Sequence, residues 1–261
     1  MSDTAPSTQM DRILAIMAKL RDPVDGCDWD RAQDFSTIAP YTIEEAYEVA
    51  DAIDRDDMAD LKGELGDLLF QVVFHSRMAE EAGHFRFEDV AQSISDKMET
   101  RHPHIFGDES GAMTNARWED LKASERAESG STSAMDGVAK ALPALLRSEK
   151  LQKRAARVGF EWHDAKGPRE KLEEELVELD EASEEERLVE AGDVLFVAVN
   201  IIRRYGVDAE AALKASNAKF ERRFRQMEDM AAADGTDFAT LSLDEQEAYW
   251  QRVKAAEKTA S

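Results

Sequence analysis

The 261-residue sequence predicts an all-α protein built from two tandem helical bundles, each with four or five short helices. Three observations support this fold class. The chain has only 13 glycines and 6 prolines, too few for a loop-rich β architecture. Its apolar residues recur with helical spacing, and no segment shows the period-2 alternation of a half-buried strand. The two halves of the chain also repeat the same blocks of residues in the same order.

The internal repeat defines the expected domain organisation. Trp29 and Trp118 in the first half correspond to Trp162 and Trp250 in the second, at offsets of 133 and 132 residues. Four blocks recur at offsets of 130, 126, 122 and 132: residues 44–48 with 174–178, 63–70 with 189–196, 97–101 with 219–223, and 118–122 with 250–254. All periodicity breaks at residues 128–137. We therefore expect an N-terminal domain at residues 1–128 and a C-terminal domain at residues 137–261.

In the first half, the apolar pattern predicts a long helix from near Asp56 to Gly83, because glycine suits the residue after a helix. Its apolar face consists of Leu61, Leu65, Leu68, Leu69, Val72 and Val73. The preceding helix is expected to start near Thr42, since Thr42 and Glu45 have the spacing of a capping box. Amphipathic stretches flank this pair at residues 10–20 and 87–100.

In the second half, Gly167 and Pro168 are expected to open the helix that carries the second acidic block. Gly206 is expected to close the helix that follows it. Further amphipathic stretches lie at residues 142–158, 209–230 and 243–258. The longest apolar run, residues 194–202, is interrupted by Asn200 and is too short to span a bilayer. We therefore expect no membrane partner.

Composition also restricts partners and location. The chain has 33 Lys and Arg against 56 Asp and Glu, and its formal charge of −23 repels nucleic acid and anionic membranes. We therefore expect no nucleic-acid polymer as a partner. The single cysteine, Cys27, cannot form an intramolecular disulfide, and residues 1–9 lack the apolar region of a secretory signal. These features predict a cytoplasmic protein.

Each half carries four carboxylates at spacings that would bring them together: Glu45, Glu48, Glu64 and Asp67, and then Glu175, Glu178, Glu190 and Asp193. Residues three apart project about 60° from one another on a helix. Packing the two apolar stripes together would gather each quartet at one rim, where mutual repulsion raises carboxylate pKa values. A hard divalent cation relieves that repulsion, and oxygen-only ligands favour Mg²⁺, with Mn²⁺ as an alternative.

A metal site of this kind predicts phosphoryl chemistry. Mg²⁺ is usually held by a few carboxylates together with substrate phosphates, so it would let a strongly anionic protein bind a nucleotide. A neighbouring carboxylate could orient or deprotonate the attacking water. Lys219 and Arg223, with Arg222 beside them, are candidates to offset the charge of the leaving group. Trp250 is a candidate to stack on a base.

A non-enzymatic alternative remains open. Glu pairs three residues apart are most often solvated surface, so the chain could be an acidic helical interaction protein or an acidic mimic of DNA. The recurrence of the quartet, each time with a glycine directly before the aspartate, favours a site. Gly66 and Gly192 each cost about 1 kcal/mol relative to alanine inside a helix. They either permit close helix packing or leave room for metal or phosphate.

The same residues resemble the MazG family. Residues 26–30, 38–48, 63–70 and 101–106 resemble its N-terminal domain, and residues 219–224 with the second acidic quartet resemble its C-terminal domain. The resemblance implies an all-α, Mg²⁺-dependent nucleoside triphosphate pyrophosphohydrolase, usually a homodimer, which converts NTPs and dNTPs to the monophosphate and pyrophosphate. A dUTPase-like or dCTPase-like enzyme of narrower specificity is the enzymatic alternative.

The resemblance also implies that the C-terminal domain is catalytic. Its metal ligands would be Glu175, Glu178, Glu190 and Asp193, which together with Glu174 are the candidate catalytic residues. Nucleotide contacts would come from Lys171, Glu174, Lys219, Arg222, Arg223 and Trp250. The chain departs from the family pattern at residues 184–189, which lack the lysine expected before the second acidic pair, and Arg187 is the candidate to replace it. The complete N-terminal quartet, Glu45, Glu48, Glu64 and Asp67, is a candidate second metal site.

Overall fold

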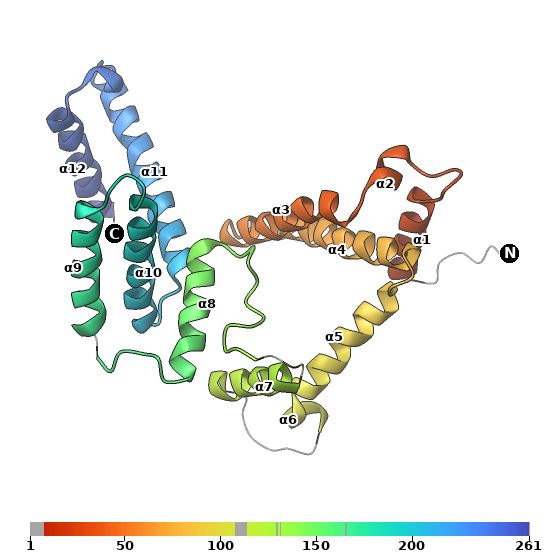
Figure 1. Cartoon of the computed structure of the whole chain (residues 1–261). Helices are drawn as coiled ribbons and strands as arrows, with labels where there is room; N and C mark the ends of the chain where they lie inside the picture. The colour runs from red at the N-terminus through yellow and green to blue at the C-terminus, as the bar shows by residue number, and fades with distance from the viewer. Residues whose placement is uncertain (1–7, 108–113, 129, 131, 165, 261) are drawn as a thin grey trace. The chain divides into compact units, whose positions relative to one another are not determined.

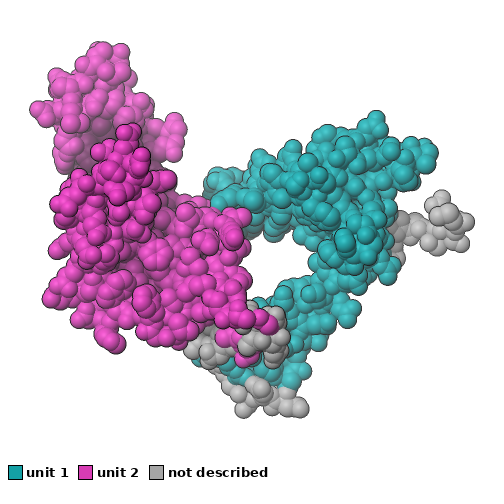
Figure 2. Space-filling model, in the orientation of Figure 1, with its two compact units in different colours: residues 1–121 teal, residues 122–261 magenta. Residues whose placement is uncertain are grey.

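A computed structural model describes residues 8–107, 114–128, 130, 132–164 and 166–260. Every regular element among these residues is a helix, so the predicted all-α fold class is confirmed (Figure 1). The chain divides into two compact units, residues 1–121 (unit 1) and 122–261 (unit 2), which Figure 2 shows in different colours. The domain limits derived from the sequence repeat stay a prediction.

Unit 1 is organised around two long paired helices, α3 (Phe35–Asp54) and α4 (Met58–Glu81) (Figure 1). Helix α1 (Gln9–Leu20) packs on α4, and α5 (Phe87–Arg101) follows α4. The shorter elements are α2 (Asp28–Ala32) and α6 (Pro103–Phe106), and α7 (Asn115–Glu128) begins in this unit. The pairing of α3 with α4 determines where their acidic residues meet.

The start of α3 differs from the predicted one. Asp34 is the N-cap of this helix, and its carboxylate accepts hydrogen bonds from two backbone amides of the first turn. The Thr37 hydroxyl accepts a hydrogen bond from the Asp34 backbone N–H, which completes a capping box. The prediction of a capping box at Thr42 was therefore wrong, because the terminal amides are already satisfied earlier in the chain. Thr42 lies inside α3, where its hydroxyl is 3.0 Å from His75 Nε2.

Several predicted helix ends are confirmed. Gly83 follows the end of α4 at φ +74°, and Gly206 follows the end of α10 at φ +72°. Only glycine adopts this left-handed conformation without strain from a Cβ atom. Pro168 lies in the first turn of α9, where its missing N–H donor costs no helical hydrogen bond.

The core of unit 1 lies where α1, α3 and α4 meet, and its buried members are Met17, Ile38, Val73, Phe74 and Met78. Phe74 is 1% exposed and contacts the Phe70 ring edge-on at 6.0 Å between centroids. Truncating a fully buried phenylalanine to alanine typically costs about 3–5 kcal/mol. This cluster therefore anchors the helix pair that carries the N-terminal acidic residues.

Unit 2 contains α8 (Ala144–Arg157), α9 (Lys166–Glu181), α10 (Arg187–Arg204), α11 (Ala209–Ala233), the 3₁₀ helix η1 (Phe238–Thr240) and α12 (Leu243–Ala260). Helices α9 and α10 pair as α3 and α4 do in unit 1, while α8 packs on α10 and α11 pairs with α12 (Figure 1). In the part of the chain that is described, no helix combines the length and apolar character needed to traverse a bilayer.

Candidate active site

The α9–α10 pair of unit 2 brings three predicted site residues together. One carboxylate oxygen from each of Glu175, Glu190 and Asp193 lies within 4.8 Å of the other two, and we name these residues the C-terminal carboxylate cluster. Glu175 comes from α9 and is only 5% exposed, whereas Asp193 of α10 is exposed. Arg187, the candidate replacement for the missing lysine, is the exposed first residue of α10. The cluster offers only oxygen ligands, which suits a hard divalent cation.

Lys171 supplies positive charge to the C-terminal carboxylate cluster. Its Nζ atom lies 2.6 Å from Glu174 Oε1, 2.8 Å from Glu175 Oε1 and 3.8 Å from Glu178 Oε2. Hydrogen bonds to Glu174 and Glu175 raise the pKa of Lys171 above its ordinary value. Desolvation, with the charge of Glu175 as a smaller effect, raises the pKa of Glu178 despite the nearby lysine. The remaining predicted acidic residues, Glu174 and Glu178, therefore lie beside the cluster and share its lysine.

The α3–α4 pair of unit 1 forms a second acidic group. Oxygens of Glu45, Glu48 and Glu64 lie within 4.8 Å of one another, and we name these residues the N-terminal carboxylate cluster. Desolvation, followed by the charges of neighbouring carboxylates that include Asp67, raises the pKa of both Glu45 and Glu64. Among the described side chains, none of the three has a lysine or arginine ion-pair partner. This cluster therefore lacks the internal counter-charge that Lys171 provides in unit 2.

The predicted cationic residues lie on the α11–α12 pair. Arg222 and Arg223 of α11 both form ion pairs with Glu257 of α12, at 3.2 and 2.7 Å. The Arg223 guanidinium also lies 5.2 Å from the centre of the Trp250 ring, in a cation–π contact. Lys219 is exposed on α11. The structure thus groups the arginines with Trp250 on one pair of helices and the C-terminal carboxylate cluster on another, and α10 packs against α11.

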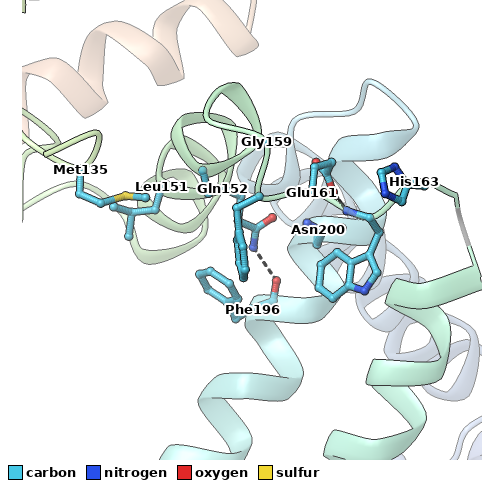
Figure 3. Close-up of a pocket in the computed structure, with 11 residues that line it drawn as sticks. Met135, Leu151, Gln152, Gly159, Glu161, His163, Phe196 and Asn200 are labelled. Carbon is cyan, nitrogen blue, oxygen red and sulfur yellow. Dashed lines mark hydrogen bonds between the residues drawn. The ribbon is translucent and has the colours of Figure 1, made fainter.

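Unit 2 also contains a pocket of about 720 Å³ that sequence reasoning missed (Figure 3). Its wall comes from Met135, α8, α10 and residues 159–163, and its lining is largely apolar and aromatic. Two amide side chains, Gln152 of α8 and Asn200 of α10, reach it although each is only 5% exposed. The one signal in the sequence was Asn200, which interrupts the longest apolar run of the chain.

The segment beside this pocket is fixed to α10 by ion pairs. The Glu161 carboxylate pairs with Arg203 and lies 3.3 Å from an Arg204 nitrogen, and Arg204 also donates a hydrogen bond to the Trp162 carbonyl. The Trp162 ring lies so close to the Gly167 backbone that a Cβ atom at Gly167 would be 2.1 Å from it. These contacts hold Trp162 against the first turn of α9, so this wall of the pocket is preformed.

These observations define the class of the protein. It is a helical protein in which two similar helix pairs each gather carboxylates into a group suited to a divalent cation, and one of these groups already holds a lysine. The sequence profile of the MazG nucleotide pyrophosphohydrolase domain matches residues 33–106, which include the N-terminal carboxylate cluster.

Full-length relatives extend this match to both units. The chain is 50% identical over 261 residues to the nucleoside triphosphate pyrophosphohydrolase of Escherichia coli (strain K12), covering 95% of the chain and 98% of the relative. It is 43% identical over 252 residues to the Thermotoga maritima nucleoside triphosphate pyrophosphohydrolase/pyrophosphatase MazG, covering 95% and 97%. A nucleoside triphosphate pyrophosphohydrolase of Mycolicibacterium smegmatis is 30% identical over 261 residues, covering 98% and 73%. The chain belongs to the MazG family.

Proposed function

We propose that this protein is a nucleoside triphosphate pyrophosphohydrolase that converts NTPs and dNTPs to the monophosphate and pyrophosphate at the C-terminal carboxylate cluster. The observation that carries this proposal is the convergence of Glu175, Glu190 and Asp193 beside Lys171. Relatives that align over nearly their whole length carry this activity in their names. A protein that only presents an acidic surface has no need of a largely buried glutamate that pairs with a lysine and faces two further carboxylates.

A divalent cation fits this site. The donor set is entirely oxygen, three ligand atoms lie within 4.8 Å, and the burial of Glu175 favours a strong local counter-charge. We assign Mg²⁺, or Mn²⁺ as its substitute, to Glu175, Glu190 and Asp193, with Glu178 as the fourth ligand. When bound, such an ion polarises phosphoryl oxygens and offsets the negative charge of the substrate.

The chain's own residues then share the remaining work of hydrolysis. Water forms the new bond to the α-phosphorus, and the bond from that phosphorus to the α–β bridging oxygen breaks. The electron pair leaves with pyrophosphate, and Glu174, the carboxylate beside the cluster that is not assigned to the metal, accepts the proton of the water. In this proposal, Lys171 and Arg187 bind phosphate oxygens of the substrate.

The α11–α12 pair would complete the binding of the nucleotide. Lys219, Arg222 and Arg223 are the proposed cationic contacts, and Trp250 lies beside Arg223. Because Glu257 holds both arginines through ion pairs, a bound triphosphate would compete with this carboxylate. The guanidinium geometry of the arginines suits bidentate binding of phosphate oxygens.

We propose further that the protein is a cytoplasmic homodimer. Apolar side chains on the helix pairs that carry both clusters are 46% to 85% exposed, and they include Tyr47, Leu65, Leu176, Val177, Leu188 and Val189. Exposed apolar patches of this kind usually mark an interface. The single cysteine, Cys27, is exposed and suits a reducing compartment. Light scattering of the purified chain measures the oligomeric state directly.

Matched substitutions in the two clusters test the proposed activity. Glu175→Gln keeps the shape of the side chain but removes its charge, and we expect pyrophosphate release to fall by about a hundredfold or more. Glu45→Gln is the control, because Glu45 holds the corresponding position in unit 1 and is expected to leave turnover nearly unchanged. Release of monophosphate and pyrophosphate is measured over a panel of NTPs and dNTPs, with Mg²⁺ and with a chelator.

Three outcomes separate the alternatives. Unchanged turnover in a folded Glu175→Gln variant would remove the C-terminal cluster from the mechanism. Loss of turnover in Glu45→Gln alone would move the active site to unit 1. Hydrolysis restricted to dUTP or dCTP would establish the narrower enzymatic alternative, and no hydrolysis of any nucleotide would favour an interaction protein.

A further inference from the structure

Lys171 lies on the acidic face of α9 and contacts three of its carboxylates. It precedes Glu174, Glu175 and Glu178 by three, four and seven residues, and these spacings place all four side chains on one face of the helix. Its Nζ atom lies 2.6 Å from Glu174 Oε1, 2.8 Å from Glu175 Oε1 and 3.8 Å from Glu178 Oε2. One ammonium group therefore lies against two of the four residues that we assign to the divalent cation, and against the proposed proton acceptor.

An ordinary surface ion pair does not account for this arrangement. Lys166 and Glu170 form such a pair on the same helix, with both side chains largely exposed, and pairs of this kind contribute little to stability. The Glu175 side chain is only 6% exposed, so its charge needs a cation close by. Compensation of a buried carboxylate therefore explains the position of Lys171.

An ammonium group and a divalent cation compete for this carboxylate. Mg²⁺ binds carboxylate oxygens at about 2.0–2.1 Å and requires near-octahedral geometry around it. Two cations beside one buried carboxylate repel each other, with little screening by water. The divalent cation carries twice the charge, whereas the ammonium is carried on a flexible four-carbon stem that can turn away without any change in α9. We therefore expect the cation to displace Lys171 from Glu175 and not to bind beside it.

We propose that Lys171 is an exchangeable counter-ion: it neutralises the C-terminal carboxylate cluster, is displaced when a divalent cation binds, and then pairs with the triphosphate. The inference rests on the proposed pyrophosphohydrolase function. A phosphate bound to the cation lies beside the same carboxylates, so the flexible side chain can transfer its ammonium from carboxylate to phosphate. This transfer also removes the ammonium that lies 2.6 Å from Glu174. The cation, the phosphate contact and the proton acceptor are therefore brought into use together.

Two affinities of Lys171→Met test the exchange. Calorimetric titration of the full chain without nucleotide is expected to show Mg²⁺ binding to unit 2 about tenfold more tightly than in the wild type, because the competing ammonium is gone. Glu175→Gln identifies the heat that belongs to unit 2. With saturating Mg²⁺, α,β-methylene ATP, whose α–β bridge is not hydrolysed, is expected to bind about tenfold more weakly, because a phosphate contact is lost.

Two further variants control for charge and for position. Lys171→Arg keeps a cation at this position, and its Mg²⁺ affinity should stay close to that of the wild type. Lys166→Met removes the exposed lysine of the same helix and should change neither affinity. Weaker or unchanged Mg²⁺ binding in Lys171→Met would overturn the proposal, because the lysine would not be competing with the cation. Unchanged binding of the nucleotide analogue would also overturn it, because the lysine would not be transferred to phosphate.

Chemical labelling of the wild-type chain keeps the proposal testable if a variant does not fold. Acetylation of lysine side chains, mapped by mass spectrometry, compares Lys171 with Lys166 in the same sample. Relative to Lys166, we expect Lys171 to be labelled slowly with chelator, several times faster with Mg²⁺, and slowly again when α,β-methylene ATP is added. No acceleration by Mg²⁺, or no protection by the analogue, would overturn the exchange. Neither affinity nor labelling depends on turnover, so a failure to hydrolyse any triphosphate would refute the proposed function and leave the displacement of Lys171 by Mg²⁺ to be decided by these measurements.

Discussion

At the scale of single residues, one lysine distinguishes the two carboxylate clusters. The acidic blocks of the two halves are offset by 130 residues, so the counterpart of Lys171 in unit 1 is Tyr41. Tyr41 contacts Trp29 edge-on and carries no positive charge. Desolvation, followed by the charges of Asp67, Glu48 and Glu64, raises the pKa of Glu45, and the N-terminal cluster has no lysine to offset this repulsion. In unit 2 Lys171 supplies this counter-charge directly, with its Nζ atom 2.8 Å from Glu175 Oε1.

Lys171→Met tests this role of the lysine. Without a divalent cation, the buried Glu175 carboxylate loses its ion-pair partner, and we expect the free energy of unfolding to fall by about 1–3 kcal/mol. Because a bound cation replaces the missing charge, Mg²⁺ should restore most of this loss. Thermal melts with chelator and with Mg²⁺ measure both effects.

Lys166→Met is the matched control for this prediction. Lys166 lies on the same helix and pairs with Glu170 at 2.8 Å, but its side chain is 77% exposed. An exposed pair of this kind contributes less than about 1 kcal/mol. Equal destabilisation of the two variants, or a Lys171→Met loss that Mg²⁺ does not restore, would contradict the counter-charge role.

Site residues that recur in a repeated pattern could be predicted from the sequence, whereas residues that occur only once in the fold could not. The acidic quartets were found because they occur twice at helical spacing, and the structure places three members of each within 4.8 Å. Gln152 was missed because an isolated glutamine in an amphipathic stretch is usually an exposed residue on the surface of a helix. Its burial follows from the packing of α8 on α10, a tertiary contact that no local pattern encodes. The pairing of Glu161 with Arg203 escaped for the same reason, since 42 residues separate the two side chains.

At the scale of helices, the glycines inside α4 and α10 call for a functional explanation. A Cβ atom added to Gly66 or to Gly192 would meet nothing within 4 Å. The interpretation that these glycines permit close helix packing is therefore wrong. The remaining interpretation is that they leave open space beside the aspartates, and in the proposed reaction a metal-bound phosphate would approach the space beside Asp193.

Gly192→Ala separates helix stability from access to the site. Alanine is the better helix former, so we expect the free energy of unfolding to rise by about 1 kcal/mol. The added methyl group would lie next to Asp193, and we expect kcat/KM for ATP to fall about tenfold. Calorimetric melts and pyrophosphate release are the two measurements.

Gly66→Ala is the control, since Gly66 has the same local surroundings in α4 of unit 1. It should be stabilised to the same extent without loss of activity. Full activity in Gly192→Ala would show that substrate does not approach this turn of α10. Loss of activity in Gly66→Ala instead would place the reaction in unit 1.

Long helices were predictable and short ones were not. The apolar period placed α4 and α8 within a few residues of their observed limits, because three or more turns give a clear pattern, and Gly206 correctly marked the end of α10. The short helices α2 and α6, of 5 and 4 residues, contain too few apolar positions to show any period. The early start of α3 was missed because two cap patterns compete in one segment, and Asp34 with Thr37 prevails over Thr42.

At the scale of the whole molecule, arginine–carboxylate pairs join segments that are distant in sequence within both units. Glu81 of α4 accepts hydrogen bonds from Arg21, which directly follows α1, and Glu161 pairs with Arg203 of α10. Burial, the largest influence in each case, raises the pKa of both glutamates. The arginines outweigh it and bring the pKa of Glu81 and of Glu161 below the ordinary 4.5. In a chain of net charge −23, these two arginines offset carboxylates that burial would otherwise make unfavourable.

These lowered pKa values predict how the protein unfolds in acid. In the native state both glutamates release their protons at lower pH than in the unfolded chain, so the unfolded state binds more protons between the two pKa values. Stability from the pairs is therefore complete above about pH 4.5 and is lost as pH falls through the native pKa values.

We expect Glu161→Gln and Glu81→Gln each to lower the melting temperature at pH 7. In each variant the melting temperature should also fall less steeply below pH 4.5 than in the wild type. Glu184→Gln, at an exposed position, serves as control, and a parallel acid limb in all three variants would contradict the assignment.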